Sequence, residues 1–225
     1  MKKIVMAAVI ATAMFAAFNA NAQSHNDKSF AFGVKVGANL STFDTMDMKL
    51  GFNAGFVAEW RINRLLALSL EPVYSLERSG INYEYSFLAQ TVEMDVTLNA
   101  NFINVPILLK VYPIGGLYVE AGPQFGFCLG GKVKTEVKFN GEVVDNLFGV
   151  PVNGEYDLKT SGDDANCNLF ELGLGFGLGY DFGHLFVGAR YNLGLTPFRS
   201  EETIGGVTIP EMKNNNISIH LGLKF

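Results

Sequence analysis

The chain has 225 residues, of which 48% are hydrophobic and 17% charged, and its formal net charge at pH 7 is −5. This negative balance argues against nucleic acid as a partner bound through a basic surface. The low charged fraction and the 25 glycines fit a chain whose outer surface meets lipid better than a soluble exported domain. The length predicts one domain.

The first 22 residues predict a secretory signal peptide. Lys2 and Lys3 precede an apolar run over residues 4–18, and Ala20-Asn21-Ala22 fits a small-x-small cleavage pattern. The run is too short for a transmembrane helix, and no second run of that kind follows. We therefore expect cleavage before Gln23 and a mature barrel domain over residues 23–225.

Eight stretches of about ten residues place large apolar side chains at every second position. Such alternation predicts β-strands, and about ten residues is the span of a tilted transmembrane strand. In chain order, the predicted strands cover about 30–40, 50–61, 66–77, 101–112, 117–128, 168–182, 185–194 and 217–225.

The connections between these strands alternate in length. The short ones cover 62–64, 113–116 and 183–184 and share one side of the sheet with both termini, whereas the long ones cover about 41–49, 78–100, 129–167 and 196–215. Short periplasmic turns and long extracellular loops are typical of outer-membrane barrels. The pattern predicts an all-β fold, an eight-stranded antiparallel up-and-down transmembrane β-barrel. The alternating stretch 132–139 is expected to extend a hairpin above the membrane.

The composition of the polar face predicts that this face points inward. In a soluble barrel it would meet water and carry many charges, whereas here much of it is glycine. An eight-stranded barrel is just wide enough for its own side chains to fill, so glycines leave room for long charged residues. Buried charges must be paired. We predict a lumen ion-pair network of Lys35, Glu59, Arg61, Glu71, Lys110, Glu120, Glu171, Asp181 and Arg190.

Aromatic residues and prolines add two local expectations. An interfacial aromatic girdle at the periplasmic border would include Phe30, Trp60, Tyr112, Tyr180, Phe182 and Phe225. Pro72, Pro106 and Pro123 each lack a backbone donor, so bulges or breaks are expected there.

The two cysteines lie at the two ends of the longest connection. Cys128 leaves the fifth predicted strand, Cys167 enters the sixth, and both have inward parity. A loop-closing disulfide is reasonable in an oxidising periplasm and would contribute about 3–4 kcal/mol. Two unpaired thiols are the alternative.

The sequence offers no catalytic, cofactor or metal site. His25 lies in the tail, His184 in a turn and His220 on an inward face, so no nucleophile, base and orienting acid gather at the outer rim. The loop aspartates lack the spacing of a calcium loop: Asp44, Asp47, Asp157, Asp163 and Asp164. The alternating glycines 173–179 are followed by no helix pattern, which excludes a phosphate-binding loop. We expect a protein without enzymatic activity.

Five segments resemble the porin-family outer-membrane β-barrel proteins of Bacteroidetes, which include PorT-like proteins. They are 33–41 (GVKVGANLS), 71–75 (EPVYS), 105–110 (VPILLK), 120–123 (EAGP) and 189–195 (ARYNLGL). The group is similar in plan to small OmpX and OmpA-type barrels, which implies eight strands in a Gram-negative outer membrane. The last strand, ending in Phe225, also resembles the assembly signal read by the barrel-assembly machinery.

Three functions remain open at this point. The first is a non-catalytic barrel with a filled lumen, which sits in outer-membrane lipid and displays loops to an extracellular or periplasmic protein partner. The second is a narrow porin-like channel for small solutes, which planar-bilayer conductance would reveal. The third is a periplasmic or secreted ligand-binding barrel, which fractionation into the outer membrane would exclude.

Overall fold

The computed structural model describes residues 30–43, 46–87, 90–144, 146–147, 150–161, 167–199, 202–204, 207–209 and 211–225. The predicted signal peptide, His25, Asp44, Asp163 and Asp164 lie outside these ranges. The regular elements of the described ranges are β-strands. No described helix has the length and apolar character needed to cross a membrane.

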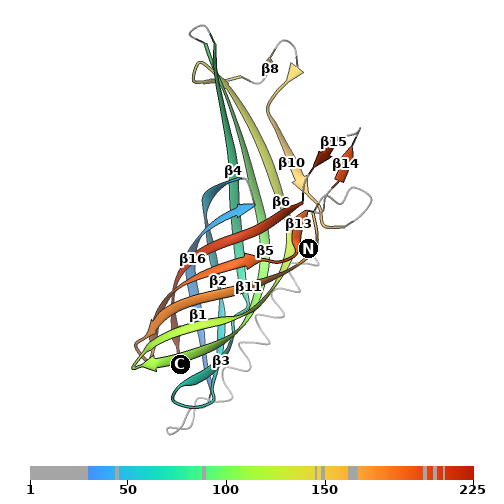
Figure 1. The fold of residues 1–225 in the computed structure, drawn as a ribbon. Helices are drawn as coiled ribbons and strands as arrows, with labels where there is room; N and C mark the ends of the chain where they lie inside the picture. Colours follow the sequence, from blue (N-terminus) through green and yellow to red (C-terminus); the bar gives the residue numbers. More distant parts are fainter. Residues whose placement is uncertain are drawn as a thin grey trace.

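Nine strands pair in sequence around a closed antiparallel ring (Figure 1). They are β1 (Phe30–Phe43), β2 (Asp47–Arg61), β3 (Leu66–Leu70), β4 (Val73–Phe87), β5 (Gln90–Ile114), β6 (Leu117–Phe139), β11 (Phe170–Asp181), β12 (Leu185–Gly194) and β16 (Met212–Lys224). β2 pairs with both β3 and β4, both of these pair with β5, and β16 returns to β1. The ring leaves no open edge in its lower part, so the backbone polar groups there bond within the sheet.

The remaining strands belong to the long connections. β7 (Glu142–Val143) and β10 (Gly154–Leu158) pair with β6, and β13 (Pro197–Arg199) pairs with β16. Two small hairpins stand apart from the main sheet: β8 (Asn146–Leu147) with β9 (Val150–Pro151), and β14 (Glu202–Ile204) with β15 (Val207–Ile209).

The main sheet thus has twelve strands, against the eight expected. Three of the additional strands come from the connections, and one arises because Pro72 lacks an N–H group and divides the third expected strand into β3 and β4. Leu70 lies opposite Ile107 and Val73 opposite Asn104, so the register on β5 is the same on both sides of this break. Pro106 and Pro123 cause no shift of register, since Pro106 pairs with Gln124 and Pro123 with Leu174, but the β5–β6 pairing is interrupted between Pro106 and Leu109.

The second and third connections are far more ordered than expected. Residues 78–87 and 90–100 continue β4 and β5, and 129–139 continues β6. The physical reason is that the alternation does not stop at the barrel: Tyr85 lies opposite Val92, and Val92 opposite Phe139. Together with β10, these strands form an antiparallel sheet that projects beyond the barrel, which we call the projecting sheet (Figure 1).

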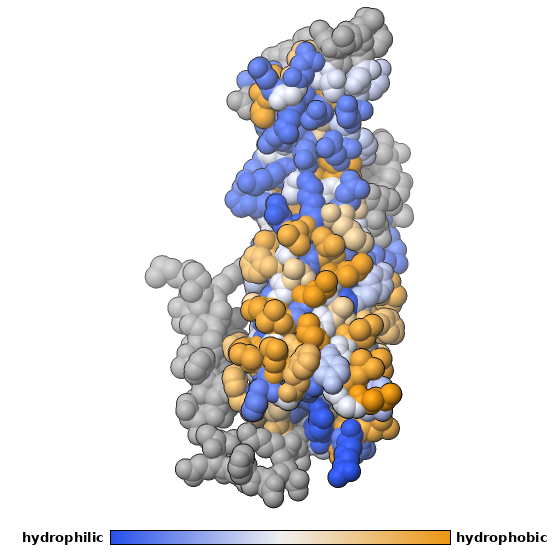
Figure 2. Space-filling view, turned by 90° about the vertical axis from the view of Figure 1, so that its left-hand side faces the viewer, coloured by the Kyte–Doolittle hydropathy of each residue, from blue (hydrophilic) through white to orange (hydrophobic). Residues whose placement is uncertain are grey.

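The face of the barrel seen in Figure 2 carries an apolar belt, and the projection above it is mostly hydrophilic. On β5 the outward-facing side chains change from apolar to polar between Ile103 and Asn99, and on β4 between Tyr74 and Arg78. About eleven residues of β5 therefore lie within the belt, which is the span of a transmembrane strand.

The short turns gather at the end of the barrel opposite the projecting sheet, where the chain also ends (Figure 1). Of the expected aromatic girdle, five members are exposed there, namely Phe30, Trp60, Tyr180, Phe182 and Phe225. The assignment of Tyr112 to the girdle is wrong, because its side chain is only 4% exposed. Tyr112 shares the inward parity of Lys110, so alternation itself directs it into the barrel.

Candidate functional site

The centre of the barrel interior, or lumen, holds five buried charged side chains from five parts of the ring. They are Lys35 on β1, Glu71 beside the β3–β4 break, Lys110 on β5, Glu120 on β6 and Arg190 on β12, and none is more than 4% exposed. We call this group the central ion cluster. It places three cations against two carboxylates.

Glu71 is the hub of the central ion cluster. Its Oε2 lies 2.8 Å from Lys35 Nζ and 2.7 Å from Arg190 Nη2, and its Oε1 lies 3.0 Å from Lys110 Nζ. Arg190 also donates from Nε to Glu120 Oε1 at 2.7 Å. Each charge therefore has an opposite charge within hydrogen-bond reach, which is the condition for keeping it away from water.

Glycines on β11 make room for long side chains of the neighbouring strand β6. A Cβ added to Gly177 would lie 2.6 Å from Glu120 Oε1, and one added to Gly179 would lie 2.4 Å from the ring of Tyr118. At either distance a Cβ would force its neighbours to shift, because backbone carbonyl oxygens also lie within 3 Å, that of Ala189 at Gly177 and that of Val187 at Gly179. The glycines of the polar face are thus part of the packing of the lumen.

A second charged group lies at the turn end of the barrel. The Glu59 carboxylate forms salt bridges with Lys110 Nζ at 3.4 Å, Lys224 Nζ at 3.1 Å and Arg61 Nη2 at 3.1 Å. Asp181 also forms salt bridges with Arg61 and Lys224. The Arg61 guanidinium also lies over the Tyr112 ring, 4.1 Å from its centre. Lys110 thereby connects this group to the central ion cluster.

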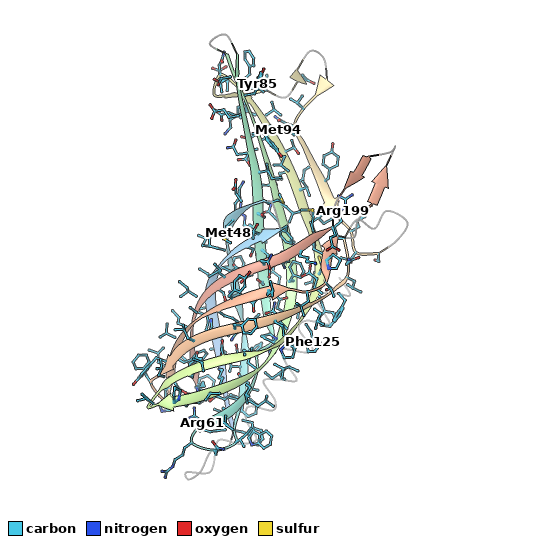
Figure 3. All side chains as sticks on the ribbon, in the orientation of Figure 1. Met48, Arg61, Tyr85, Met94, Phe125 and Arg199 are labelled. Atoms are coloured by element: carbon cyan, nitrogen blue, oxygen red, sulfur yellow. The ribbon has the colours of Figure 1, made fainter. Side chains whose placement is uncertain are left out.

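These side chains line a cavity of about 390 Å³ at the turn end. Its walls include Glu59, Arg61, Tyr112, Asp181 and Lys224, and Arg61 is the most exposed of the charged ones, with 38% of its side chain accessible. Arg61 lies at this end of the barrel in Figure 3. The charged side chains at the turn end therefore border open space, whereas those of the central ion cluster are buried.

The opposite end of the lumen is closed by apolar side chains. Phe43, Phe102 and Phe198 are at most 1% exposed, and their rings pack at 4.7 Å (Phe43 with Phe198) and 6.0 Å (Phe102 with Phe198) between centres. Met46, Leu98, Ala100, Cys128 and Cys167 complete this cluster. We call it the apolar plug.

Both cysteines lie in the apolar plug as buried free thiols. They belong to the same buried cluster. Cys167 Sγ contacts the carbonyl oxygen of Lys159 at 3.4 Å, and the Gly130 amide donates to Cys128 Sγ at 3.4 Å. The fold thus brings together the two ends of the third connection, as their parity predicted; whether they form a disulfide stays a prediction.

Eight of the nine residues of the predicted lumen network form ion pairs with one another in this structure: Lys35, Glu59, Arg61, Glu71, Lys110, Glu120, Asp181 and Arg190. Glu171 differs, because its hydrogen bond comes from the amide of Asn214. The predicted network omits two further buried charged residues of inward parity: Lys224 pairs with Glu59 and Asp181, and Glu77 accepts hydrogen bonds from Asn104 and Asn214.

The projecting sheet has two unlike faces. One continues the lumen-facing side of the strands and is apolar, with Tyr83 opposite Met94 and Tyr85 opposite Val92. Tyr83 and Tyr85 are 62% and 70% exposed, and Figure 3 shows Tyr85 and Met94 near the far end of the projection. Tyr156 on β10 is also exposed.

The other face of the projecting sheet is charged. It carries Glu84, Glu93, Asp95, Lys132, Lys134, Glu136, Lys138, Glu155 and Asp157. A hydrogen bond from Lys49 lowers the pKa of Asp95, and hydrogen bonds from Lys132 and Lys134 lower that of Glu155. These acidic groups are thus held ionised next to their cations.

The described ranges contain no cluster of three or more His, Cys, Asp or Glu side chains suited to a metal ion. His220 is buried next to Phe186, with ring centres 6.1 Å apart, and neither of its nitrogens has a hydrogen-bond partner among the residues that the structure describes. His184 Nδ1 lies 3.1 Å from the Lys224 carbonyl oxygen in a turn. Neither histidine is joined to a nucleophile in an arrangement suited to acid–base catalysis.

Solved structures of small outer-membrane proteins align with nearly the whole chain at low identity. The Ail protein of Yersinia pestis, solved in complex with the heparin analogue sucrose octasulfate, is 12% identical, with 87% of this chain and 97% of that chain covered and a TM-score of 0.39. Neisserial surface protein A is 13% identical, with 88% and 98% covered and a TM-score of 0.37. OprG of Pseudomonas aeruginosa is 11% identical, with 90% and 99% covered and a TM-score of 0.38.

No curated protein sequence matches the chain significantly. A family model described as outer membrane protein beta-barrel domain matches residues 21–200. This match covers most of the chain, including the strands that carry the central ion cluster. The chain therefore belongs to the outer membrane protein β-barrel domain family and resides in the outer membrane.

Proposed function

We propose that the protein is a non-enzymatic outer-membrane barrel with a filled lumen, which uses the projecting sheet and the loops around it to bind a partner at the cell surface. The observation that carries this proposal is the exposed aromatic face of the projecting sheet. β5 has 25 residues, whereas about 9–11 suffice to cross the membrane. More than half of this strand therefore serves a purpose other than anchoring.

The aromatic face is suited to protein recognition. Exposed tyrosines supply large contact areas with few rotatable bonds and are enriched in protein interfaces. Tyr83, Tyr85 and Tyr156 stand on one side of a sheet whose other side is charged. The partner is accordingly a protein with a complementary apolar patch.

The membrane-spanning part is, in this proposal, an eight-stave barrel in which β3 and β4 form one stave. The unchanged register across Pro72 supports this reading. Sequence segments such as 33–41 and 105–110 favour a relation to the PorT-like proteins of Bacteroidetes. Residues 1–22 would serve as the export signal. Assembly would involve the barrel-assembly machinery acting on the strand that ends in Phe225.

The arrangement of the lumen favours display over transport. The central ion cluster and the apolar plug lie in series, and the 390 Å³ cavity reaches only the turn end. A narrow solute channel is the second candidate, supported by that cavity and its charged walls. Residence in the outer membrane excludes the third candidate, a secreted ligand-binding barrel.

Two experiments separate these functions. Purified protein in a planar bilayer should give no stable channel, and a reproducible open conductance would replace our proposal by the transport function. In a pull-down with extracellular proteins, Tyr83→Ser/Tyr85→Ser should lose capture that the unmodified chain shows. The matched control Asn82→Ser/Glu84→Gln alters the charged face of the same strand and should keep it. Equal capture by both double variants would contradict an aromatic binding face.

A further inference from the structure

Two carboxyl groups in the upper lumen are buried without a positive partner. Glu77 is 1% and Glu171 8% exposed, and no described Lys, Arg or His forms an ion pair with either. One amide connects them: Asn214 Nδ2 lies 2.6 Å from Glu77 Oε2 and 3.2 Å from Glu171 Oε2. Asn104 adds a hydrogen bond of 2.9 Å to Glu77 Oε1. Two buried negative charges held by neutral amides alone are costly.

This pair lies next to the apolar plug. Glu171 on β11 pairs with Gly126 on β6, and Gly126 pairs with Asn104 on β5. The inward positions two residues away on β6 and β5 are Cys128 and Phe102, which belong to the plug. A Cβ added to Gly126 would lie 3.0 Å from Asn104 Oδ1, so this row of the sheet is tightly packed. A second charge in the row would therefore disturb the strands that carry the plug.

The charges of the described lumen do not balance while both carboxyl groups are ionised. The cations are Lys35, Arg61, Lys110, Arg190 and Lys224, and each forms an ion pair with one of the lower carboxylates Glu59, Glu71, Glu120 and Asp181. Glu77 and Glu171 add two further negative charges to these four. A single proton on the upper pair would leave equal numbers of positive and negative charges.

Oxygen atoms beside Glu171 also require a hydrogen-bond donor. Glu171 Oε1, Asn192 Oδ1 and Asn214 Oδ1 are buried and accept no described hydrogen bond. Their side chains surround a cavity of about 10 Å³, which has room for one water molecule at most. One water donates two hydrogen bonds and leaves the third oxygen without a donor. An ionised carboxylate only accepts hydrogen bonds, whereas a protonated carboxyl group also donates one.

We propose that Glu77 and Glu171 share one proton at neutral pH and act as a pH-sensitive switch beside the apolar plug. With the proton bound, the pair carries one negative charge, which the amides of Asn104 and Asn214 stabilise. Loss of the proton places two like charges on either side of the Asn214 amide. The switch then loosens the packing of Phe102 and Cys128 as the pH rises.

The other titratable groups around the pair do not replace the proton. The thiols of Cys128 and Cys167 are close enough to interact electrostatically with it, and their ionisation would only add negative charge. The groups that follow toward the barrel centre are Lys35 on β1, Lys110 on β5, Glu120 on β6, Arg190 on β12 and His220 on β16. The three cations among them form their ion pairs with carboxylates below Glu77 and Glu171.

Infrared spectra of the purified barrel in detergent test for the shared proton. Exposed carboxyl groups are ionised at about pH 7, so a band of protonated carboxyl there comes from a buried group. The unmodified protein should show this band. Glu171→Gln should lack it, because Glu77 then carries the one negative charge that balances the lumen. The control Glu136→Gln, on the charged face of the projecting sheet, should keep it.

Urea unfolding of the barrel in phospholipid vesicles tests the switch. The unfolded chain has released this proton above about pH 5, so the folded state binds one proton more and a rising pH favours unfolding. Between about pH 5.5 and about pH 7.5, the unfolding constant of the unmodified barrel should rise at least tenfold more than that of Glu171→Gln. His184 and the remaining titratable groups are present in both proteins, so the difference isolates the pair.

A second variant covers the case in which Glu171→Gln does not fold. Glu77→Gln also leaves a single carboxylate and should lose both the infrared band and the additional pH dependence. Absence of the band from the unmodified barrel would overturn the proposal, as would its persistence in either folded variant. Equal pH dependence of unfolding in the unmodified barrel and the variants would overturn it as well.

Discussion

Replacing Arg190 by leucine removes the cation that joins the two carboxylates of the central ion cluster. Glu71 keeps Lys35 at 2.8 Å and Lys110 at 3.0 Å, but Glu120 keeps only Lys110, at 3.8 Å. Removing one partner of a buried pair typically costs about 3–5 kcal/mol, because the remaining charge stays buried. At about 2–4 °C per kcal/mol for a chain of this size, the melting temperature should fall by roughly 6–20 °C.

Far-ultraviolet circular dichroism of the refolded barrel in detergent measures this effect. Arg64→Leu, in an exposed turn, is the matched control and should change the stability by no more than about 0.5 kcal/mol. Adding Glu120→Gln to Arg190→Leu should recover part of the loss, since the stranded charge is then removed. Equal melting temperatures for Arg190→Leu and the unmodified protein would refute a stabilising role of this ion pair, as would a double variant that is no more stable than Arg190→Leu.

Three further perturbations follow from the structure. Gly179→Ala would place a Cβ 2.4 Å from the Tyr118 ring and from the Val187 carbonyl oxygen, and should destabilise the folded barrel by about 1–3 kcal/mol. The control Gly154→Ala, outside the barrel, should have little effect in the same melting assay. Oxidation should link Cys128 and Cys167, so that alkylation of unreduced, denatured protein labels neither; two labelled thiols would show that the bond does not form. Deletion of Phe225, whose amide donates to the Phe32 carbonyl oxygen at 2.8 Å, should lower the yield of folded barrel in the outer-membrane fraction, and an unchanged yield would argue against an assembly role.

Alternation in the sequence was sufficient to predict which side chains enter the lumen. Lys35, Glu71 and Arg190 are far apart in the chain, yet a period of two and the count of connections place all three inside. Their mutual distances could not be predicted, because these depend on the stagger between strands, which alternation does not encode. Aromatic character alone assigns Tyr112 to the girdle, whereas its parity with Lys110 places it in the lumen.

The ends of β4 and β5 show a different limit. The outward face changes from apolar to polar near Arg78 and Asn99, and this change marks the edge of the apolar belt while both strands continue beyond it. The same strands continue with their apolar side chains on the other face, at Tyr83 and Met94. The Glu77–Glu171 pair was missed because only the fold brings β4 and β11 to the same Asn214 amide.

The pairing of β1 with β16 joins the first and last described strands along eleven positions. This contact spans nearly the whole chain, so it carries the largest loop-closure cost and is expected to form late in folding. A chain interrupted before Met212 would leave β1 and β12 with open edges, and each unpaired backbone group in lipid costs several kcal/mol. Such fragments would not persist in the bilayer and would stay within reach of proteases. The hydrocarbon layer thus selects for complete chains, because it retains only those long enough to close the ring.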